Sequence, residues 1–312
     1  MWNGRRYHSF DAMLKERFGE KLYKLTLQSG LTCPNRDGTL SSAGCLFCSA
    51  QGAGEFAAPS SLPLNEQIDA AKALISSKYQ GSRFIAYYQS FTNTYAPAPA
   101  LRALYTPVIR REDIAVLSIA TRPDCLGREQ LQVLEELAKE KPLWVELGLQ
   151  TASDATARRI NRCYPTRVYD EAVRQLHGIG AEVITHMIAG LPGEGEEDAF
   201  ATAEHIGQMH SDGIKIHLLH VLKGTGLAAL YERGEYVPLT EEEYVRTVAG
   251  IISRLPGEMV IHRLTGDGSK ESLLSPLWSR NKRAVLNHIQ RELRRRQIVQ
   301  GDYFRETGRK NP

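Results

Sequence analysis

Strand-like and helix-like segments alternate along the chain, and this alternation limits the possible folds more than any other feature. Seven short runs rich in β-branched and apolar residues predict strands, at 22–28, 83–90, 114–121, 143–150, 182–189, 213–221 and 258–264. Patterns typical of helices lie between them, at 65–79, 98–109, 128–140, 167–178, 196–211 and 240–254. Strands separated by helices predict a parallel sheet with right-handed crossovers, because each helix carries the chain back to the start of the next strand.

The two faces of the predicted strands favour a barrel. In the segment 143–150, Glu146, Gly148 and Gln150 share one face, and the apolar residues between them share the other. The apolar face can pack under helices, and the polar face can line an interior site near the C-terminal ends of the strands. The sequence therefore predicts an α/β barrel, complete or partial, with a doubly wound open sheet as the alternative.

Length and charge indicate one domain with a basic C-terminal part. The net charge of the 312 residues is +3, which is too small to indicate a partner by itself. The charge is uneven, because residues 279–312 contain ten Lys or Arg against three acidic residues. We expect a single domain over 1–312, with a barrel core at about 20–265 and a basic helical extension at about 266–312.

No segment predicts export or membrane insertion. The first ten residues contain no apolar stretch after Arg5 and Arg6, and no apolar run approaches the roughly 20 residues that span a bilayer. We therefore expect a cytoplasmic protein without a membrane partner. In that reducing compartment the five cysteines predict metal binding or catalysis rather than disulfides.

Three of the cysteines follow the first predicted strand, in a loop rich in Gly, Ser, Asn and Pro. Eleven residues separate Cys33 from Cys45, and two separate Cys45 from Cys48. Thiolates are soft ligands that suit both iron–sulfur clusters and zinc. A four-iron cluster with three protein ligands leaves one iron open, whereas a closed zinc site needs a fourth ligand, which Cys125 could supply from a distance. The position of the loop at the C-terminal end of a strand favours the cluster.

The motifs around this loop resemble those of the YhcC/YtqA-type radical S-adenosylmethionine (SAM) proteins, relatives of the catalytic subunit of Elongator and of oxygen-independent coproporphyrinogen oxidase. The similarity lies in the segments YHSFDAMLKERFGEKLYKLTL, CPNRDGT, GCLFCSAQGAGEF, ELGLQT, HMIAGLPGE and HRLTGDG. It implies a partial (β/α)6-type barrel with a short N-terminal extension, a 4Fe-4S cluster on Cys33, Cys45 and Cys48, and SAM on the open iron. It also implies a low-potential electron donor, either flavodoxin or ferredoxin.

The same resemblance implies where SAM would bind at the strand ends. Phe47, just before the last cysteine of the loop, is expected near the adenine. Ser90 and Thr92 are candidates for the methionine amino group, although this segment departs from the usual Gly-Gly-Glu pattern. Glu146 and Gln150 match a Glu-x-Gly-x-Gln motif, and the Gln150 amide suits ribose hydroxyls because it both donates and accepts hydrogen bonds.

Four further residues are placed at the SAM site by the resemblance. Arg162 falls where related enzymes have an arginine that pairs with the SAM carboxylate, and a guanidinium suits a carboxylate bidentately. His186 stands in the place of an acidic ribose partner. Gly190 and Gly193 would bring the backbone close to the adenine.

Two of these residues have a purely structural alternative. Glu146 could pair with Arg122 or Lys24 to satisfy the barrel interior. Arg162 could be an ordinary surface arginine.

For the substrate, the resemblance implies tRNA. Members of the family are linked to maturation of the wobble uridine, in which 5-carboxymethylaminomethyl-uridine, often 2-thiolated, becomes the 5-aminomethyl form. Side chains that could act on the substrate lie near predicted strand ends: Lys223, Cys163, Arg263 and Asp267. Trp278 and Lys282 could close over a flipped base, with Trp278 stacking on it. Arginines of the extension could contact phosphates or form a solvated helix face: Arg291, Arg294, Arg295 and Arg296.

Three functions stay open from the sequence. The first is a radical SAM enzyme that modifies tRNA, and the second is a radical SAM oxidoreductase that acts on a small metabolite. The third is a zinc-stabilised nucleic-acid-binding protein without catalysis. Iron and sulfide content separates the third from the others, and salt-sensitive retention of tRNA separates the first from the second.

Overall fold

Seven strands form the main sheet of the computed structural model, which describes residues 2, 4–50, 52, 58–79, 81–266, 268 and 271–305. The strands are β1 (Tyr23–Leu27), β2 (Phe84–Tyr88), β3 (Ile114–Thr121), β4 (Leu143–Gln150), β5 (Glu182–Ala189), β6 (Gly213–Leu218) and β8 (Val260–Arg263). Each strand pairs with the next one in this series, and every pair is parallel. The predicted parallel sheet is confirmed, and β3, β4 and β5 have the predicted bounds.

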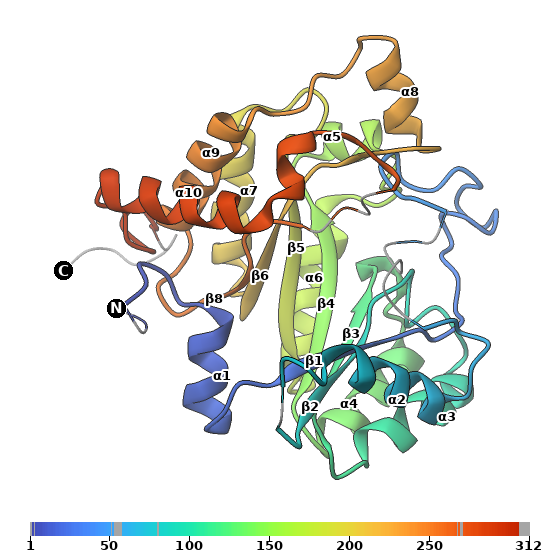
Figure 1. The fold of residues 1–312 in the computed structure, drawn as a ribbon. Helices are drawn as coiled ribbons and strands as arrows, with labels where there is room; N and C mark the ends of the chain where they lie inside the picture. Colours follow the sequence, from blue (N-terminus) through green and yellow to red (C-terminus); the bar gives the residue numbers. More distant parts are fainter. Residues whose placement is uncertain are drawn as a thin grey trace.

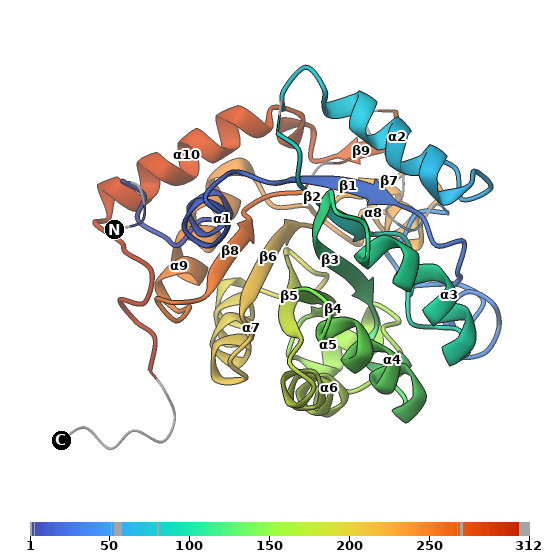
Figure 2. The ribbon, with the colours of Figure 1, turned by 90° about the horizontal axis from the view of Figure 1, so that it is seen from below.

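The strand order distinguishes a curled half-barrel from a doubly wound sheet. In a doubly wound sheet the order reverses at a switch point, whereas here it runs in one direction throughout. The strands curve round an interior space, and the helices lie outside it (Figure 1 and Figure 2). Within the described residues β1 and β8 do not pair with each other, so the barrel stays open between them. We call this opening the seam.

Helices cover the outer face of the sheet. The longer ones are α2 (Leu64–Ile75), α3 (Ala98–Ile109), α4 (Arg128–Ala138), α6 (Thr166–Gly178), α7 (Glu196–Gln208) and α9 (Glu241–Ser253), and the shorter ones are η1 (Pro123–Cys125), α5 (Asp154–Arg159) and α8 (Gly226–Glu232). On β4, Leu147 and Leu149 are fully buried in the apolar core, whereas Glu146 and Gln150 face the interior. The two predicted faces of this strand are therefore confirmed. In the part of the chain that the structure describes, no helix is long and apolar enough to cross a bilayer.

Helix α1 (Phe10–Phe18) closes the N-terminal end of the half-barrel and is absent from the sequence prediction. Its first turn is capped by Ser9, whose Oγ accepts the Ala12 N–H at 3.4 Å. Leu14 is buried in an apolar cluster that includes Trp144, at the start of the strands. Because this end is filled by side chains, a site can form only at the opposite, C-terminal ends of the strands.

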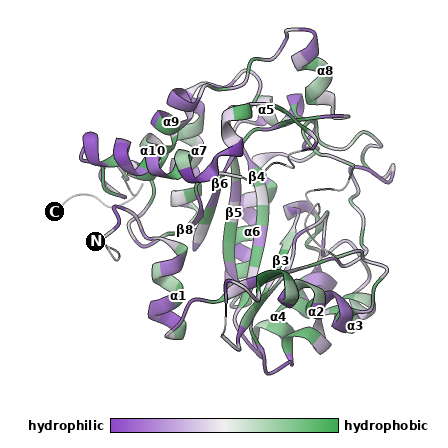
Figure 3. Ribbon diagram, viewed as in Figure 1, coloured by the Kyte–Doolittle hydropathy of each residue, from purple (hydrophilic) through white to green (hydrophobic). Residues whose placement is uncertain are grey.

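The C-terminal part of the chain packs beside α9 as a basic helix. After the short antiparallel pair of β7 (Val221–Leu222) with β9 (Leu273–Ser275), and the turn η2 (Leu277–Arg280), comes α10 (Lys282–Arg295). On the inner side of α10, Val285, Ile289 and Leu293 are fully buried, because residues three or four apart share a helix face. Much of the rest of this helix is hydrophilic (Figure 3). The predicted basic helical extension thus contains one well-formed helix.

Candidate active site

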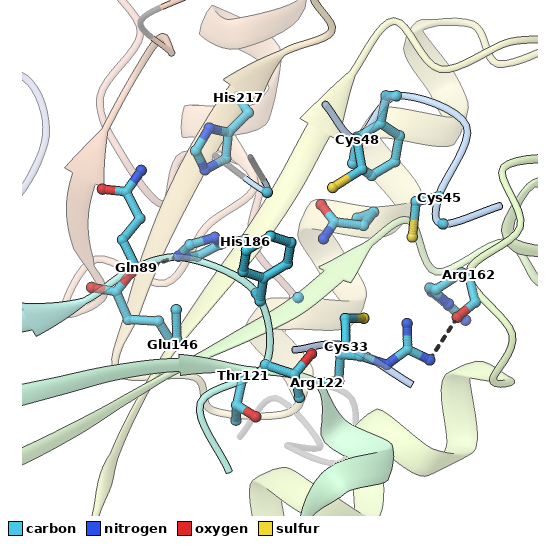
Figure 4. A pocket seen from close by; sticks show the side chains of 18 of the residues that line it. Cys33, Cys45, Cys48, Gln89, Thr121, Arg122, Glu146, Arg162, His186 and His217 are labelled. Carbon is cyan, nitrogen blue, oxygen red and sulfur yellow. Dashed lines mark hydrogen bonds and ion pairs between the residues drawn. The ribbon is translucent and has the colours of Figure 1, made fainter. Parts of the chain in front are cut away.

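A cavity lies between the loop after β1 and the C-terminal ends of the strands. We call residues 31–50 the cysteine loop and this space the cysteine cavity. Side chains of the loop and of the strand ends are directed toward it (Figure 4). A second cavity, the mouth cavity, adjoins it on the side of β6, and Phe47, Gln150 and His217 line both. The expected site at the strand ends therefore comprises two adjoining cavities.

All three predicted cluster ligands, Cys33, Cys45 and Cys48, line the cysteine cavity as free thiols. The loop that carries them is fixed by its backbone, because the Leu46 N–H donates to the Ile160 carbonyl at 3.0 Å. Burial raises the pKa of the Cys45 thiol to about 12, so this thiolate forms readily only when a metal shares its charge. Three soft donors on one cavity wall fit an iron–sulfur cluster.

Cys125 does not join these three thiols. It lines a different cavity, next to Pro34 and Tyr95. The zinc hypothesis thereby loses the fourth ligand that the sequence allowed.

A buried amide connects the cysteine loop to the turn before α6. The Nδ2 of Asn35 donates to Cys45 Sγ at 3.4 Å and to the Asn161 carbonyl at 2.6 Å. On its other side, Asn35 Oδ1 accepts the Cys163 thiol at 2.9 Å. Cys163 therefore lies behind Cys45, a predicted cluster ligand, is exposed to solvent, and does not line the cysteine cavity, where a substrate-side thiol would have to be.

Glu146 is the centre of a buried network in the barrel interior. Its Oε1 lies 2.9 Å from Lys24 Nζ and accepts the Ser118 hydroxyl at 2.8 Å. Its Oε2 accepts Lys215 Nζ and lies 2.7 Å from His186 Nε2. Burial alone would raise the pKa of Glu146, but the ammonium groups of Lys215 and Lys24 outweigh burial and hold that pKa well below its ordinary value. The carboxylate is therefore ionised and satisfied by the protein itself, and its pairing with Lys24 was one of the alternatives open from the sequence.

Two imidazoles beside this network are neutral at physiological pH. Burial lowers the pKa of His186 to about 4 and lowers the pKa of His217 well below its ordinary value. Their ring centroids are 5.1 Å apart. Among the described residues, no hydrogen-bond partner is found for the buried Nε2 of His217. His217 lines both cavities, so this nitrogen is an unsatisfied polar group at the edge of the site.

The end of β4 has an unusual backbone that brings Gln150 over the cavity. Gln150 has a φ of 69°, and a non-glycine residue in the left-handed region costs on the order of 1 kcal/mol, so such residues cluster at functional sites. The side chain folds back over Gly148, where a Cβ would come within 2.8 Å of the amide nitrogen. Gly148 therefore permits the position of the Gln150 amide.

Of the two hydroxyls predicted near the methionine amino group, Thr92 lines the cysteine cavity and Ser90 does not. Both side chains are almost fully buried, and neither hydroxyl has a partner among the described residues. A buried polar group without a partner costs about 1–3 kcal/mol, so the Thr92 hydroxyl is suited to a polar ligand.

Arg162 is 1% exposed, which excludes the alternative of an ordinary surface arginine. Its Nη1 donates to the carbonyls of Leu149 and Thr151 at 2.7 and 2.6 Å. Arg122 in turn donates to the Arg162 carbonyl at 2.9 Å (Figure 4). Both arginines line the cysteine cavity, but the guanidinium of Arg162 already braces the end of β4. Arg122 is likewise engaged, because its Nε and Nη2 donate to the Asp124 carboxylate at 2.9 and 2.7 Å.

The two glycines after β5 are explained by the turn they form. Gly190 has a φ of 87°, and a Cβ there would lie 3.0 Å from Leu239. Gly193 has a φ of 79°, and a Cβ there would lie 1.8 Å from Arg159 Nη1. Neither glycine lines the cysteine cavity or the mouth cavity. The side chain predicted near the adenine, Phe47, lines both.

The residues predicted to act on the substrate are dispersed. Arg263 lines the cysteine cavity and the mouth cavity. Lys223 is exposed. Its backbone N–H donates to the Ser272 carbonyl at 2.8 Å, next to the pairing of β7 with β9. Asp267 lies outside the described residues.

Trp278 is a packing residue in this structure. Its Nε1 donates to the Leu239 carbonyl at 3.2 Å, and its ring centroid lies 5.7 Å from that of Tyr244. It lines neither the cysteine cavity nor the mouth cavity. The prediction that Trp278 stacks on a base is not supported by this placement, because the aromatic ring is already packed against the core.

The basic residues of the extension do not share one surface. Arg295 and Arg296 both pair with Glu292, at 2.8 and 2.5 Å, whereas Lys282 and Arg294 line a third cavity beside β8. The fourth predicted arginine, Arg291, is exposed.

Lys215 was not among the site residues predicted from the sequence, although its position in an apolar strand was a signal for a buried ion pair. This lysine interrupts the apolar strand β6 and is 3% exposed. A lysine is almost never fully buried without a partner, so its place on the inner face of a strand already predicts a buried acid nearby. Asn35 was also not predicted, and its closeness in sequence to Cys33 was the available signal.

A half-barrel of parallel strands with three thiols in the loop after the first strand defines the radical SAM class. The chain matches the Radical SAM superfamily over residues 32–206 and the Radical_SAM C-terminal domain over residues 211–295, and it belongs to this superfamily. Membership implies a 4Fe-4S cluster and SAM as cofactors, and the residues described above fit both.

Within the superfamily, the chain is similar to proteins from bacteria and archaea. YtqA of Bacillus subtilis is 43% identical over 300 residues, which cover 96% of this chain and 93% of that protein. YhcC of Escherichia coli K12 is 35% identical over 285 residues, 91% of each chain. The solved structure of the archaeal Methanocaldococcus infernus Elp3 with an N-terminal deletion has a TM-score of 0.68 and 15% identity, and it covers 89% of this chain and 64% of that one. The last comparison supports the fold.

Proposed function

We propose that this protein is a radical SAM enzyme that converts 5-carboxymethylaminomethyl-uridine, or its 2-thio form, in the wobble position of tRNA to the 5-aminomethyl form. The proposal is carried by the placement of Cys33, Cys45 and Cys48 on one wall of a cavity whose other walls are polar strand ends. When bound, the cluster and SAM supply a radical able to abstract hydrogen from an unactivated carbon. The tRNA substrate follows from the family resemblance of the sequence motifs.

The chain's own residues would hold and orient SAM. Phe47 offers an apolar surface for the adenine, and Gln150 offers an amide for the ribose. Thr92 and His217 each offer a polar group without a protein partner among the described residues. Glu146 is bound by lysines and histidine, so it acts by keeping the strand ends in place.

The proposed reaction balances with SAM as the two-electron oxidant. The methylene carbon of the carboxymethyl group loses a hydrogen atom, which forms the new C–H bond of 5′-deoxyadenosine. Loss of one electron and one proton from the resulting carbon radical would give an imine, and this electron would replace the one that flavodoxin or ferredoxin supplied at the start, so no net electron is consumed. Water then cleaves the C–N bond, so the products are aminomethyl-uridine, glyoxylate, methionine, 5′-deoxyadenosine and a proton.

Anaerobic reconstitution tests this proposal. The loaded protein is given SAM and dithionite with or without bulk tRNA, and 5′-deoxyadenosine, glyoxylate and the modified nucleosides are measured. We expect tRNA to increase 5′-deoxyadenosine and to yield aminomethyl-uridine with one glyoxylate per product. Equal 5′-deoxyadenosine formation with and without tRNA, and no change in the nucleosides, would contradict the tRNA substrate and favour a small metabolite.

A further inference from the structure

We propose that the seam of the half-barrel is a phosphate-binding groove, which holds the RNA backbone while a base enters the cysteine cavity. This inference rests on the tRNA substrate proposed above and adds the surface that binds it. The groove is the third cavity, framed by the N-terminal segment 4–11, by β8 and by α10. We call it the seam groove.

Positive charge dominates the lining of the seam groove. Seven of its lining residues are Lys or Arg, of which Lys24 and Lys215 are paired with Glu146, and one, Asp11, is acidic. The Asp11 carboxylate is already paired with Lys15, at 2.9 Å. A concave surface with such an excess of cations attracts phosphodiester groups, which supply most of the affinity of proteins for nucleic acids.

One face of α10 supplies regularly spaced donors to this groove. Arg283, Asn287, Gln290 and Arg294 line it, and their spacing of four, three and four residues places them along one stripe of the helix. The orientation of the stripe is fixed, because the buried residues Val285, Ile289 and Leu293 hold α10 on α9. Arginine and amide side chains in a row can contact successive phosphates.

The seam groove adjoins the cysteine cavity. Lys215 and Arg263 line both spaces, so these two side chains form the wall between them. Figure 2 shows α10 lying along the side of the molecule where β1 and β8 end the sheet. A backbone held in the groove would therefore lie next to the radical site, which an unstacked base must reach in enzymes that act on a base.

The same helix offers a matched control. Arg295 and Arg296 carry the same charge as Arg283 and Arg294, but both pair with Glu292 and neither lines the groove. We compare the cluster-loaded double variant Arg283→Gln, Arg294→Gln with the control Arg295→Gln, Arg296→Gln. Binding of bulk tRNA is measured anaerobically by fluorescence anisotropy across a range of salt concentrations.

We expect the groove variant to bind tRNA on the order of tenfold more weakly, with a salt slope smaller by about 1 to 2, and the control to change less than twofold. A variant that places acids on the same stripe, Asn287→Glu with Gln290→Glu, should weaken binding in the same way and is available if the first loses its fold. Equal binding by the groove variant and the wild type, or equal weakening by both arginine pairs, would overturn the groove and leave the proposed function standing. Failure of the wild type to bind tRNA, together with 5′-deoxyadenosine formation that ignores tRNA, would overturn both.

Discussion

Lys24 on β1 and Glu146 on β4 form an ion pair across the interior of the half-barrel, with 2.9 Å between Nζ and Oε1. The Glu146 side chain is fully buried, and its second oxygen is bound by Lys215 on β6. Through these two lysines the carboxylate connects β4 to β1 and β6, and β1 is at the open edge of the sheet. This pairing keeps the strand ends in place below the cysteine cavity.

Removing the charge of Glu146 should destabilise the protein strongly. The Glu146→Gln variant leaves the buried ammonium group of Lys215 and the half-buried one of Lys24 without their counter-ion, and breaking a buried ion pair costs about 3–5 kcal/mol. Urea unfolding under anaerobic conditions gives the change in the free energy of unfolding. The control is Glu136→Gln, which removes an acid paired with Arg102 on the surface and should have little effect. Equal stability of the two variants would show that the interior pair contributes nothing.

Alanine at Cys33, Cys45 or Cys48 should abolish the cluster, since each removes one of the three proposed iron ligands. The Cys125→Ala variant is the control, because this thiol lines a different cavity. Iron and acid-labile sulfide analysis after reconstitution checks the result. A full load of four irons in any of the three ligand variants would refute the assignment of that cysteine.

Replacing Asn35 should shift the potential of the cluster. Its amide donates to Cys45 Sγ at 3.4 Å, and a donor to a thiolate ligand stabilises the reduced, more negative cluster. We expect Asn35→Leu to lower the reduction potential by on the order of 50 mV, as a tenfold one-electron effect would. A redox titration monitored by electron paramagnetic resonance measures it.

The control for Asn35 is Cys163→Ser, which keeps a hydrogen-bond donor to the Asn35 Oδ1. Its cluster potential should match that of the wild type. An unchanged potential in Asn35→Leu would mean that this amide only packs the loop.

Gln150 and Arg162 should respond differently to truncation. Gln150→Ala is expected to weaken SAM binding about tenfold with little loss of stability, because the amide faces the cavity and its hydrogen bonds would go to the ligand. Arg162→Ala is expected to cost about 2–4 kcal/mol of unfolding free energy, because it leaves the Leu149 and Thr151 carbonyls without their donor. Equilibrium dialysis with SAM and denaturant unfolding measure the two effects. If the stability of Arg162→Ala is unchanged, Arg162 does not brace the end of β4, and SAM binding is its remaining proposed role.

The stability of the protein should fall as the pH drops through the range set by His186. Burial lowers the pKa of this imidazole from 6.5 to about 4, so between these values the unfolded chain binds a proton that the folded protein does not. Stability therefore rises with pH across this window and is lost as the pH falls from about 6.5 toward 4. The loss from this group should be about 2 kcal/mol between pH 7 and pH 5.

The variant His186→Gln tests the pH effect, because it keeps a donor for Glu146 but cannot titrate. Its midpoint of thermal unfolding should change less between pH 7 and pH 5 than that of the wild type. The same pH dependence in both proteins would assign the effect to other groups.

Much of the fold could be predicted from local patterns along the chain. Runs rich in β-branched and apolar residues favour strands, and such runs located β3, β4 and β5 to the residue. Helix α1 was missed because its role depends on filling the end of a barrel with Leu14, a contact with Trp144 that is distant in the sequence. The ending of β6 at Leu218, earlier than predicted, reflects the separate pairing of β7 with β9.

The sequence by itself determined the class of the protein: parallel strands crossed by helices, and three thiols spaced in one loop after the first strand. Both features depend on residues that are close together in the chain, so their spacing in the sequence is enough to identify them. Only the tertiary structure decided that Glu146 is held by Lys24 and Lys215, that Arg162 is buried, and that the barrel stays open at the seam. Those outcomes depend on which distant side chains meet, because a buried charge must find its partner wherever the packed strands bring one.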